Sequence, residues 1–282
     1  MAYRLLALDI DGTLLTSRKE LTPRTRQAVL TLKEQGWLVT LVSGRRHLFM
    51  LDIASSLELT SPVVAFNGGM VFCPVSQQVL DCISIPLADL KDLAATLVAS
   101  QVPVGIYTSS FNPPDIFILG GELLLEHSPY LLPLVQERQG MFISSLAELP
   151  GEAMRLMVGG SEGVTTKALE IAQPWLHQEK LWYMHSRDYD GTWYLEIFPQ
   201  GSGKAKGLGK VCDYLKVTLQ EVIAIGDQVN DVEMLQVAGL GVATGNAVAA
   251  AREAAQLVIG HHDHEGVAIY LESLTSSPLQ LP

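Results

Sequence analysis

Apolar residues in the first part of the chain form short runs separated by a segment with helix signals. The runs Arg4–Leu8 and Trp37–Val42 have the length of strands that are buried on both faces. Between them, Thr22 offers an N-cap hydroxyl, Pro23 suits the first helical position, and Gly36 ends the segment. The pattern therefore predicts a strand, a helix and a second strand in succession.

The same alternation returns near the C-terminus. Strands that alternate with helices form a parallel sheet with helices on both faces, so the two ends of the chain predict one α/β core. A third strand and a hairpin complete its N-terminal part. The remaining predicted strands are Val63–Phe66, Met70–Phe72, Gln78–Asp81, Val222–Ile225, Leu240–Ala243 and Leu257–Ile259, and the helices are Lys206–Leu215, Asn230–Ala238 and Ala247–Ala255.

Residues 85–196 follow a different pattern and carry most of the negative charge. About six Lys and Arg stand there against about fourteen Asp and Glu, whereas the whole chain has a formal net charge of −11. We therefore predict an α+β domain of residues 85–196 inserted into a core of residues 1–84 and 197–282. Its predicted helices are Leu87–Ser100, Leu123–Glu137 and Thr165–Gln178, and its strands are Pro103–Tyr107, Ile116–Leu119, Met154–Gly159 and Trp193–Ile197.

Composition narrows the class of protein. Hydrophobic residues make up 48% of the 282 residues, enough for a sizeable core, and no apolar run is long enough to span a membrane. Asp9 and Asp11 interrupt the first apolar run before a signal-peptide core could form, which favours a soluble cytoplasmic protein. Cys73, Cys82 and Cys212 lack the spacing of a zinc site or a disulfide framework.

The acidic charge argues against nucleic acid as a partner, because phosphate backbones select basic surfaces. Polar residues nevertheless follow the ends of four predicted strands: Asp9, Ser43, Asn67 and Asp227. Ligands of such sheets bind at the carboxyl ends of the strands, so we expect these side chains to converge. An acidic protein that binds phosphate at such a point must concentrate its few cations, or a metal ion, there.

The segment Asp9-Ile10-Asp11-Gly12-Thr13 follows the first predicted strand. Two acids two residues apart point the same way on a regular strand, and their repulsion is relieved by a divalent cation; oxygen ligands favour Mg²⁺. Gly12 permits the sharp exit that brings backbone groups close to a ligand. The alternative is an ordinary acidic turn.

A second acidic segment, residues 226–231, follows the strand Val222–Ile225. Asp227 is placed to complete a metal site with the Asp9 region, while Asn230 and Asp231 begin the next helix. An Asx turn with a helix cap is the alternative interpretation.

Two further segments are candidates for phosphate binding. In Ser43-Gly44-Arg45 a hydroxyl and exposed amides suit a phosphate oxygen, although a plain helix cap fits the tripeptide equally well. Arg45 either contacts substrate or is solvated. Gly201-Ser202-Gly203-Lys204 fails the P-loop pattern, since Phe198 and Ala205 replace its first glycine and its hydroxyl. We interpret it as a loop that delivers Lys204 to a phosphate, with Lys206 as a competing candidate.

The tract His261-His262-Asp263-His264-Glu265 has the composition of a metal-binding segment. Adjacent histidines on a loop seldom converge without a scaffold, and the chain already offers an oxygen-rich site. We therefore predict a solvated loop here.

Taken in order, these motifs resemble the haloacid dehalogenase (HAD) superfamily. The Asp9–Leu14 segment, Ser43-Gly44-Arg45, Asn67-Gly68-Gly69, Lys204 and the Asp227–Asp231 segment have its order and spacing. The long insertion resembles the Cof-type, C2B-capped (subclass IIB) sugar-phosphatase branch, and so do Gly245-Asn246-Ala247 and Glu265-Gly266-Val267. The resemblance implies a Rossmann-like, doubly wound parallel core with an inserted α+β cap domain.

The resemblance also implies site roles. Asp9 would form an aspartyl-phosphate, and Asp11 would act as acid and then base. Mg²⁺ would be held by Asp9, the backbone carbonyl of Asp11, and Asp227. Ser43 and Lys204 would bind the phosphoryl group, Asn230 would help near substrate or metal, and Asp231 would support the site; Gly44, Arg45 and Asn67 are further substrate-binding candidates. The family's lysine usually precedes a glycine, which here follows Lys206 instead.

The implied function is hydrolysis of small-molecule phosphate monoesters, with the insertion as a lid over the leaving group. An acidic lid is poorly suited to a second phosphate, so neutral, hydroxyl-rich or aromatic leaving groups are expected, sugar phosphates first. A phosphomutase and a non-catalytic binding protein of the same fold are the alternatives. Candidate lid contacts are Tyr107, Asn112, His185, Arg187, Asp188 and Tyr189.

Overall fold

The chain forms two compact units. The computed structural model describes residues 3–119, 131–137, 140–187 and 191–276. One unit, the core unit, combines Met1–Cys82 with Ser202–Pro282, and the other, the inserted unit, comprises Ile83–Gly201. These divisions lie within a few residues of the domain boundaries that the sequence suggests.

The core unit is built on a five-stranded parallel sheet with the strand order β14-β13-β12-β1-β2. Its central pair joins the two ends of the chain, since Leu5 of β1 lies opposite Val222 of β12. The parallel sheet that the alternating pattern predicts is thus confirmed. The strands are β1 Leu5–Leu8, β2 Leu38–Leu41, β12 Val222–Gly226, β13 Leu240–Ala243 and β14 Leu257–Val258.

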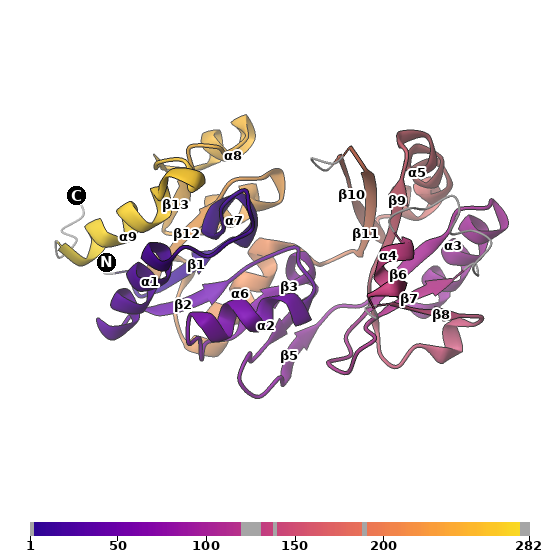
Figure 1. Cartoon of the computed structure of the whole chain (residues 1–282), viewed down its shortest axis with the longest axis horizontal. Coiled ribbons are helices and arrows are strands. Elements are labelled where there is room, and N and C mark those ends of the chain that lie inside the picture. The colour runs from indigo at the N-terminus through magenta and orange to yellow at the C-terminus, as the bar shows by residue number, and fades with distance from the viewer. Residues whose placement is uncertain (1–2, 120–130, 138–139, 188–190, 277–282) are drawn as a thin grey trace. The chain divides into compact units, whose positions relative to one another are not determined.

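Helices cover both faces of this sheet (Figure 1). Leu5 and Ala7 pack against α6 and α7, while Leu6 and Leu8 point to the opposite face, and all four are fully buried. On that face, α1 contacts β2 and α9. The helices are α1 Pro23–Glu34, α2 His47–Ser56, α6 Lys204–Leu215, α7 Val232–Val237, α8 Ala249–Ala254 and α9 Gly266–Ser276.

The third predicted strand belongs to a second sheet. β3 (Val63–Ala65) pairs with β4 (Met70–Phe72), which pairs with β5 (Val79–Cys82), all antiparallel. The predicted hairpin is confirmed, and β3 also contacts the parallel sheet, through a bridge between Val42 and Val64 and a hydrogen bond from the Ser43 N–H to the Val64 carbonyl. The left-handed backbone of Phe66 and Asn67, with φ of 50° and 52°, turns the chain from β3 directly into β4.

The inserted unit is a six-stranded sheet, β10-β11-β9-β6-β7-β8, antiparallel except for the pair β7 and β8. Leu90 and Leu93 of α3 and Ala168 of α5 pack on one of its faces. Its elements are α3 Leu87–Ala99, α4 Leu131–Gln136, α5 Glu162–His177, β6 Val104–Thr108, β7 Ile116–Leu119, β8 Gly140–Ile143, β9 Ala153–Gly160, β10 Leu181–Arg187 and β11 Trp193–Pro199.

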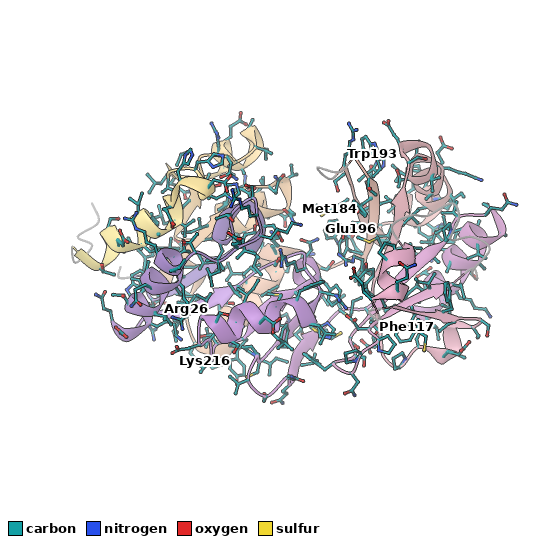
Figure 2. The ribbon with its side chains drawn as sticks, in the orientation of Figure 1. Arg26, Phe117, Met184, Trp193, Glu196 and Lys216 are labelled. Atoms are coloured by element: carbon teal, nitrogen blue, oxygen red, sulfur yellow. The ribbon has the colours of Figure 1, made fainter. Side chains whose placement is uncertain are left out.

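Strands β8 and β10 have no counterpart in the sequence prediction. On β10 and β11, Met184 lies opposite Glu196 (Figure 2). Glu196 also forms an ion pair with Arg155 of β9. β10 ends in His185, Ser186 and Arg187 and therefore lacks the continuous apolar run that marks a fully buried strand. Of the predicted helix Leu123–Glu137, residues 123–130 lie outside the described residues. Within the described ranges, no helix is long and apolar enough to cross a membrane.

Gly68 and Gly36 provide a matched test of how the β3–β4 turn is held. Both have left-handed backbones, with φ of 89° and 91°, but a Cβ on Gly68 would lie 2.0 Å from the Gly203 carbonyl oxygen, whereas one on Gly36 meets nothing. We expect Gly36→Ala to lower the free energy of unfolding by about 1 kcal/mol through backbone strain. Gly68→Ala should lower it by roughly 3 kcal/mol or more, because overpacking is added. Urea unfolding of both variants checks this, and equal losses would contradict it.

Candidate active site

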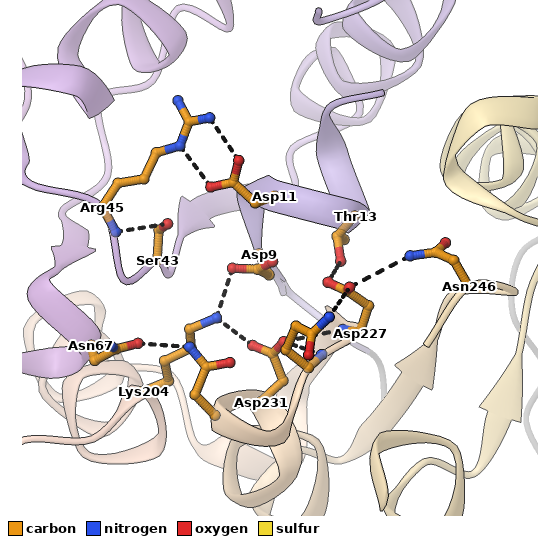
Figure 3. A network of polar contacts seen from close by, with 12 residues as sticks. Asp9, Asp11, Thr13, Ser43, Arg45, Asn67, Lys204, Asp227, Asp231 and Asn246 are labelled. Atoms are coloured by element: carbon orange, nitrogen blue, oxygen red, sulfur yellow. Dashed lines mark hydrogen bonds and ion pairs between the residues drawn. The ribbon is translucent and has the colours of Figure 1, made fainter. Parts of the chain in front are cut away.

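Polar side chains gather at the carboxyl ends of the central strands, as the sequence predicts. Asp9 directly follows β1, Asp227 directly follows β12, and Ser43 follows β2. Their order across the sheet follows from the pairing of β12, β1 and β2. The turn after β3 joins them, because the Asn67 N–H donates to the Ser43 carbonyl at 3.0 Å. Figure 3 shows the resulting network.

The Asp9–Thr13 segment forms a wide turn rather than a continued strand. The Leu14 and Leu15 N–H groups donate to the carbonyls five residues earlier, and the buried Ile10 and Leu14 side chains anchor the turn. Gly12 has φ of 74°, and a Cβ there would lie 2.3 Å from Asp227 Oδ2. Only glycine therefore lets the turn approach the Asp227 carboxylate this closely.

Lys204 lies between two buried carboxylates. Its Nζ is 2.7 Å from Asp9 Oδ1 and 2.6 Å from Asp231 Oδ1, and all three side chains are at most 5% exposed. Burial alone would lower the pKa of Lys204, but the charges of Asp231 and Asp9 raise it above its usual range, so the ammonium form is held. Lys204 is the first residue of α6 rather than part of a loop, and Lys206 is exposed. The geometry thus brings Lys204, and not Lys206, to Asp9.

Asp227 is buried without an ion-pair partner among the described residues. Its carboxylate instead accepts hydrogen bonds from the Thr13 hydroxyl at 3.0 Å and from the side-chain amides of Gln228 at 3.3 Å and Asn246 at 3.4 Å. Burial and the neighbouring Asp231 charge raise the pKa of Asp227 to about 6. Burial also raises the pKa of Asp9 well above its usual range, although Lys204 opposes this.

Asp231 has both carboxylate oxygens engaged. One accepts from Lys204, and the other accepts from the backbone N–H groups of Asp227 and Gln228 at 3.0 and 2.9 Å. It therefore holds the turn after β12 and the lysine together, as expected of a supporting residue.

The carboxylates of Asp9, Asp227 and Asp231 offer oxygens that all lie within 4.8 Å of one another. Lys204 supplies one positive charge against three acids, and two of these acids have raised pKa values. A further cation would relieve this excess of buried negative charge. Because every donor is a hard oxygen, the residues present fit Mg²⁺.

Asp11 points away from this carboxylate cluster and toward Arg45 (Figure 3). The Arg45 Nε and a terminal nitrogen donate to its two oxygens, each at 2.7 Å. Partial burial raises the pKa of Asp11, but the Arg45 hydrogen bond and charge outweigh it and lower the pKa overall. Arg45 is thus neither simply solvated nor unpaired, since its side chain is 20% exposed and holds Asp11.

Ser43, Gly44 and Asn67 pack against one another where the chain leaves β2 and β3. The helix cap of α2 is Arg46, so Ser43 is not the cap that the alternative interpretation required. Ser43 is buried and its Oγ accepts from the Arg45 N–H at 3.2 Å, while a Cβ on Gly44 would lie 3.0 Å from Asn67 Oδ1. Asn230 donates to Asn67 Oδ1 at 2.8 Å, and its own Oδ1 is buried with no hydrogen-bond partner among the described residues. That oxygen is a ready acceptor for a ligand.

Asn246 is part of this network, although sequence reasoning gave it no role beyond a family motif. Its Nδ2 donates to the Gly12 carbonyl at 2.8 Å as well as to Asp227, and its Oδ1 accepts from the His262 N–H at 3.2 Å. Thr13 was likewise part of a motif without a function of its own. The contacts of Asn246 and Thr13 with Asp227 show that both residues position this candidate metal ligand.

Residues 6–118 and 162–271 match the model of one protein family, that of the haloacid dehalogenase-like hydrolases. The chain belongs to this family. The resemblance drawn from the motifs is confirmed, and with it the α/β core that carries an inserted unit. The family consists of hydrolases, so this HAD-like protein is an enzyme, and the Asp9–Thr13 segment is more than an ordinary acidic turn.

Named relatives of this HAD-like hydrolase are phosphatases. It is 28% identical to the 5-amino-6-(5-phospho-D-ribitylamino)uracil phosphatase YitU of Bacillus subtilis, over 96% of this chain and 97% of the relative. It is also 28% identical to the pyridoxal phosphate phosphatase YbhA of Escherichia coli, over 97% and 99%. A haloacid dehalogenase-like hydrolase from Bacteroides thetaiotaomicron has a similar structure, with a TM-score of 0.81, 26% identity and coverage of 96% and 99%.

The candidate lid residues occupy varied places in the inserted unit. Tyr107 is a core residue, 2% exposed, with its ring 4.1 Å from the Arg155 guanidinium and its hydroxyl donating to Met157. His185 Nε2 lies 2.9 Å from the Thr165 hydroxyl. Asn112 and Arg187 are exposed, and Asp188 and Tyr189 lie outside the described residues.

The raised pKa of Asp227 predicts a stability gain when its charge is removed. Its pKa is near 3.8 when unfolded and about 6 when folded, so the buried charge destabilises the metal-free fold above pH 6, and the penalty fades as the pH falls toward 4. We expect Asp227→Asn to raise the free energy of unfolding of the metal-free enzyme at pH 7.5 by about 1–3 kcal/mol.

We expect Mg²⁺ to raise the thermal unfolding temperature of the wild type, and the same variant should lose this stabilisation. Asp213→Asn, on the exposed face of α6, removes one charge without changing the buried cluster and serves as the control. A metal-free Asp227→Asn variant that is less stable than wild type at pH 7.5 would contradict the prediction.

Proposed function

We propose that this enzyme is a Mg²⁺-dependent phosphatase that hydrolyses small-molecule phosphate monoesters through an aspartyl-phosphate on Asp9. The observation that carries the proposal is the buried Asp9 carboxylate, 2.7 Å from a lysine and clustered with two further acids at the end of a parallel sheet. Phosphoryl transfer mainly requires such positioning and the neutralisation of phosphoryl oxygens. A cytoplasmic location remains a prediction from the sequence.

In the first step, an Asp9 oxygen attacks phosphorus, the bond to the leaving-group oxygen breaks, and Asp11 gives that oxygen a proton. In the second step, Asp11 takes a proton from water as the water oxygen attacks the aspartyl-phosphate, which releases phosphate and restores Asp9. Asp11 must leave Arg45 to protonate the leaving group, because the paired carboxylate is held ionised. Arg45 is then available to bind phosphoryl oxygens.

The remaining site residues position the phosphoryl group. Lys204, already at Asp9, carries a fixed positive charge for the equatorial oxygens, and Ser43 and Gly44 offer a hydroxyl and an amide. Asn67 orients Asn230 through their amide contact. Asp9, the Asp11 carbonyl and Asp227 would hold Mg²⁺, which supplies further neutralisation of the phosphoryl oxygens when bound.

The substrate class follows from charge and from the relatives. Residues 85–196 have an excess of acids, which disfavours a substrate with a second phosphate. The names of the two relatives state that they act on monophosphates, and the leaving groups of these substrates carry hydroxyls and a ring. We therefore propose sugar phosphates and phosphates of hydroxyl-bearing ring compounds as substrates.

A phosphate-release screen over a metabolite panel tests the proposal. We expect Mg²⁺-dependent release by the wild type and a loss of at least about 10³-fold in Asp9→Asn, because the nucleophile is removed. Circular dichroism and thermal unfolding confirm that the variant is folded. No release by the wild type, or equal rates, would contradict the mechanism. Dependence on a bisphosphate activator without free phosphate would identify a phosphomutase instead.

Lys204 and Lys206 form a matched pair on α6. Lys204→Met removes the ammonium between Asp9 and Asp231, so we expect kcat/KM to fall by about 10²-fold or more and stability to fall by about 3–5 kcal/mol. Lys206→Met changes an exposed side chain and should leave both close to wild type. Steady-state kinetics with urea unfolding measures the two effects, and a larger kinetic loss in Lys206→Met would refute the assignment.

A further inference from the structure

His261, His262 and Asp263 form a cluster outside the carboxylates of the active site. They lie between β14 and α9, and each offers a potential metal-binding atom within 4.8 Å of the others. The sequence predicts a solvated loop here, but the His262 side chain is only 8% exposed. The prediction does not hold for His262, because distant segments supply the scaffold that adjacent histidines need.

That scaffold is the segment directly after the Asp9–Thr13 motif. His262 Nδ1 lies 2.7 Å from the Leu15 carbonyl oxygen, and the Ser17 N–H donates to Asp263 Oδ1 at 2.7 Å. The His262 backbone N–H is held by Asn246. Both the histidine ring and the carboxylate are therefore fixed by backbone groups from elsewhere in the fold.

These contacts assign the protons on His262. A carbonyl oxygen only accepts, so Nδ1 carries the hydrogen and Nε2 of the neutral ring presents its lone pair. Nε2 lies 3.7 Å from Asp263 Oδ2, the oxygen that the Ser17 N–H does not take. Two acceptors that face each other are satisfied by a cation or a hydrogen donor between them, which can be a proton on His262, a water molecule or a metal ion. Metal-binding histidines commonly donate their other N–H to a carbonyl in this way.

We propose that His261, His262 and Asp263 form a second cation site that takes a first-row transition metal, such as Zn²⁺ or Co²⁺, rather than Mg²⁺. Imidazole nitrogens with one carboxylate suit these ions, whereas Mg²⁺ prefers oxygen ligands and water. His261 Nδ1 accepts the Asp263 N–H at 3.1 Å, so metal binding through this nitrogen would exchange the hydrogen bond for a metal bond. Asn246 lies between the two sites, because its amide contacts both the His262 N–H and Asp227.

Co²⁺ binding to tag-free, chelator-stripped enzyme in excess Mg²⁺ tests this site, since the excess Mg²⁺ is there to fill the carboxylate cluster proposed above. Visible absorption and equilibrium dialysis report the ion. We expect one Co²⁺ per chain in the wild type and a Kd at least about 10-fold weaker in His262→Gln, whose amide still donates to Leu15. Asp263→Asn, which still accepts from Ser17, should weaken binding similarly.

His264→Gln is the matched control, because His264 lies in the same tract but outside the donor set. It should bind Co²⁺ as the wild type does. No Co²⁺ bound by the wild type, or equal weakening by His262→Gln and His264→Gln, would overturn the site. The readout is metal binding and not phosphate release, so failure of this proposal and failure of the phosphatase proposal are distinguishable.

Discussion

The site depends on the ion pairs that a single buried ammonium makes with two carboxylates. Lys204 lies 195 residues after Asp9 in the sequence, yet its Nζ contacts both Asp9 and Asp231 in a region from which water is nearly excluded. Removing water from three acids is unfavourable unless positive charge compensates them. This contact therefore joins the two halves of the core unit on either side of the inserted unit, and it fixes the position of the Asp9 carboxylate.

The carboxylates are also held in place by close packing, because backbone glycines lie directly against them. Gly12 lies against Asp227, and Gly226 lies against Asp231, with a Cβ at either position falling within 2.6 Å of the carboxylate. The carboxylates are thus held by steric fit as well as by hydrogen bonds. Rigid acids that raise one another's pKa values are unfavourable for stability but suit cation binding, a common compromise at functional sites.

Two clusters of candidate metal-binding side chains lie on either side of Asn246 in the core unit, and they differ in the atoms that they offer. The carboxylate cluster offers only oxygens, whereas the His261–Asp263 cluster offers imidazole nitrogens with one carboxylate. Asn246 connects them, with its amide nitrogen on Gly12 and Asp227 and its amide oxygen on His262. The turn that carries Asp9 is accordingly braced from both sides, by Asn246 at Gly12 and by His262 at Leu15.

The sequence alone determined the parallel core and which strand ends carry polar groups, because alternating apolar runs and helix signals are local, and parallel strands present their carboxyl ends at one edge. That was enough to bring Asp9, Ser43 and Asp227 together. Only the tertiary structure decided that Asp11 pairs with Arg45, that Lys204 rather than Lys206 reaches Asp9, and that β3 leaves the parallel sheet. These outcomes depend on contacts between segments that are distant in the sequence, which no local pattern of residues encodes.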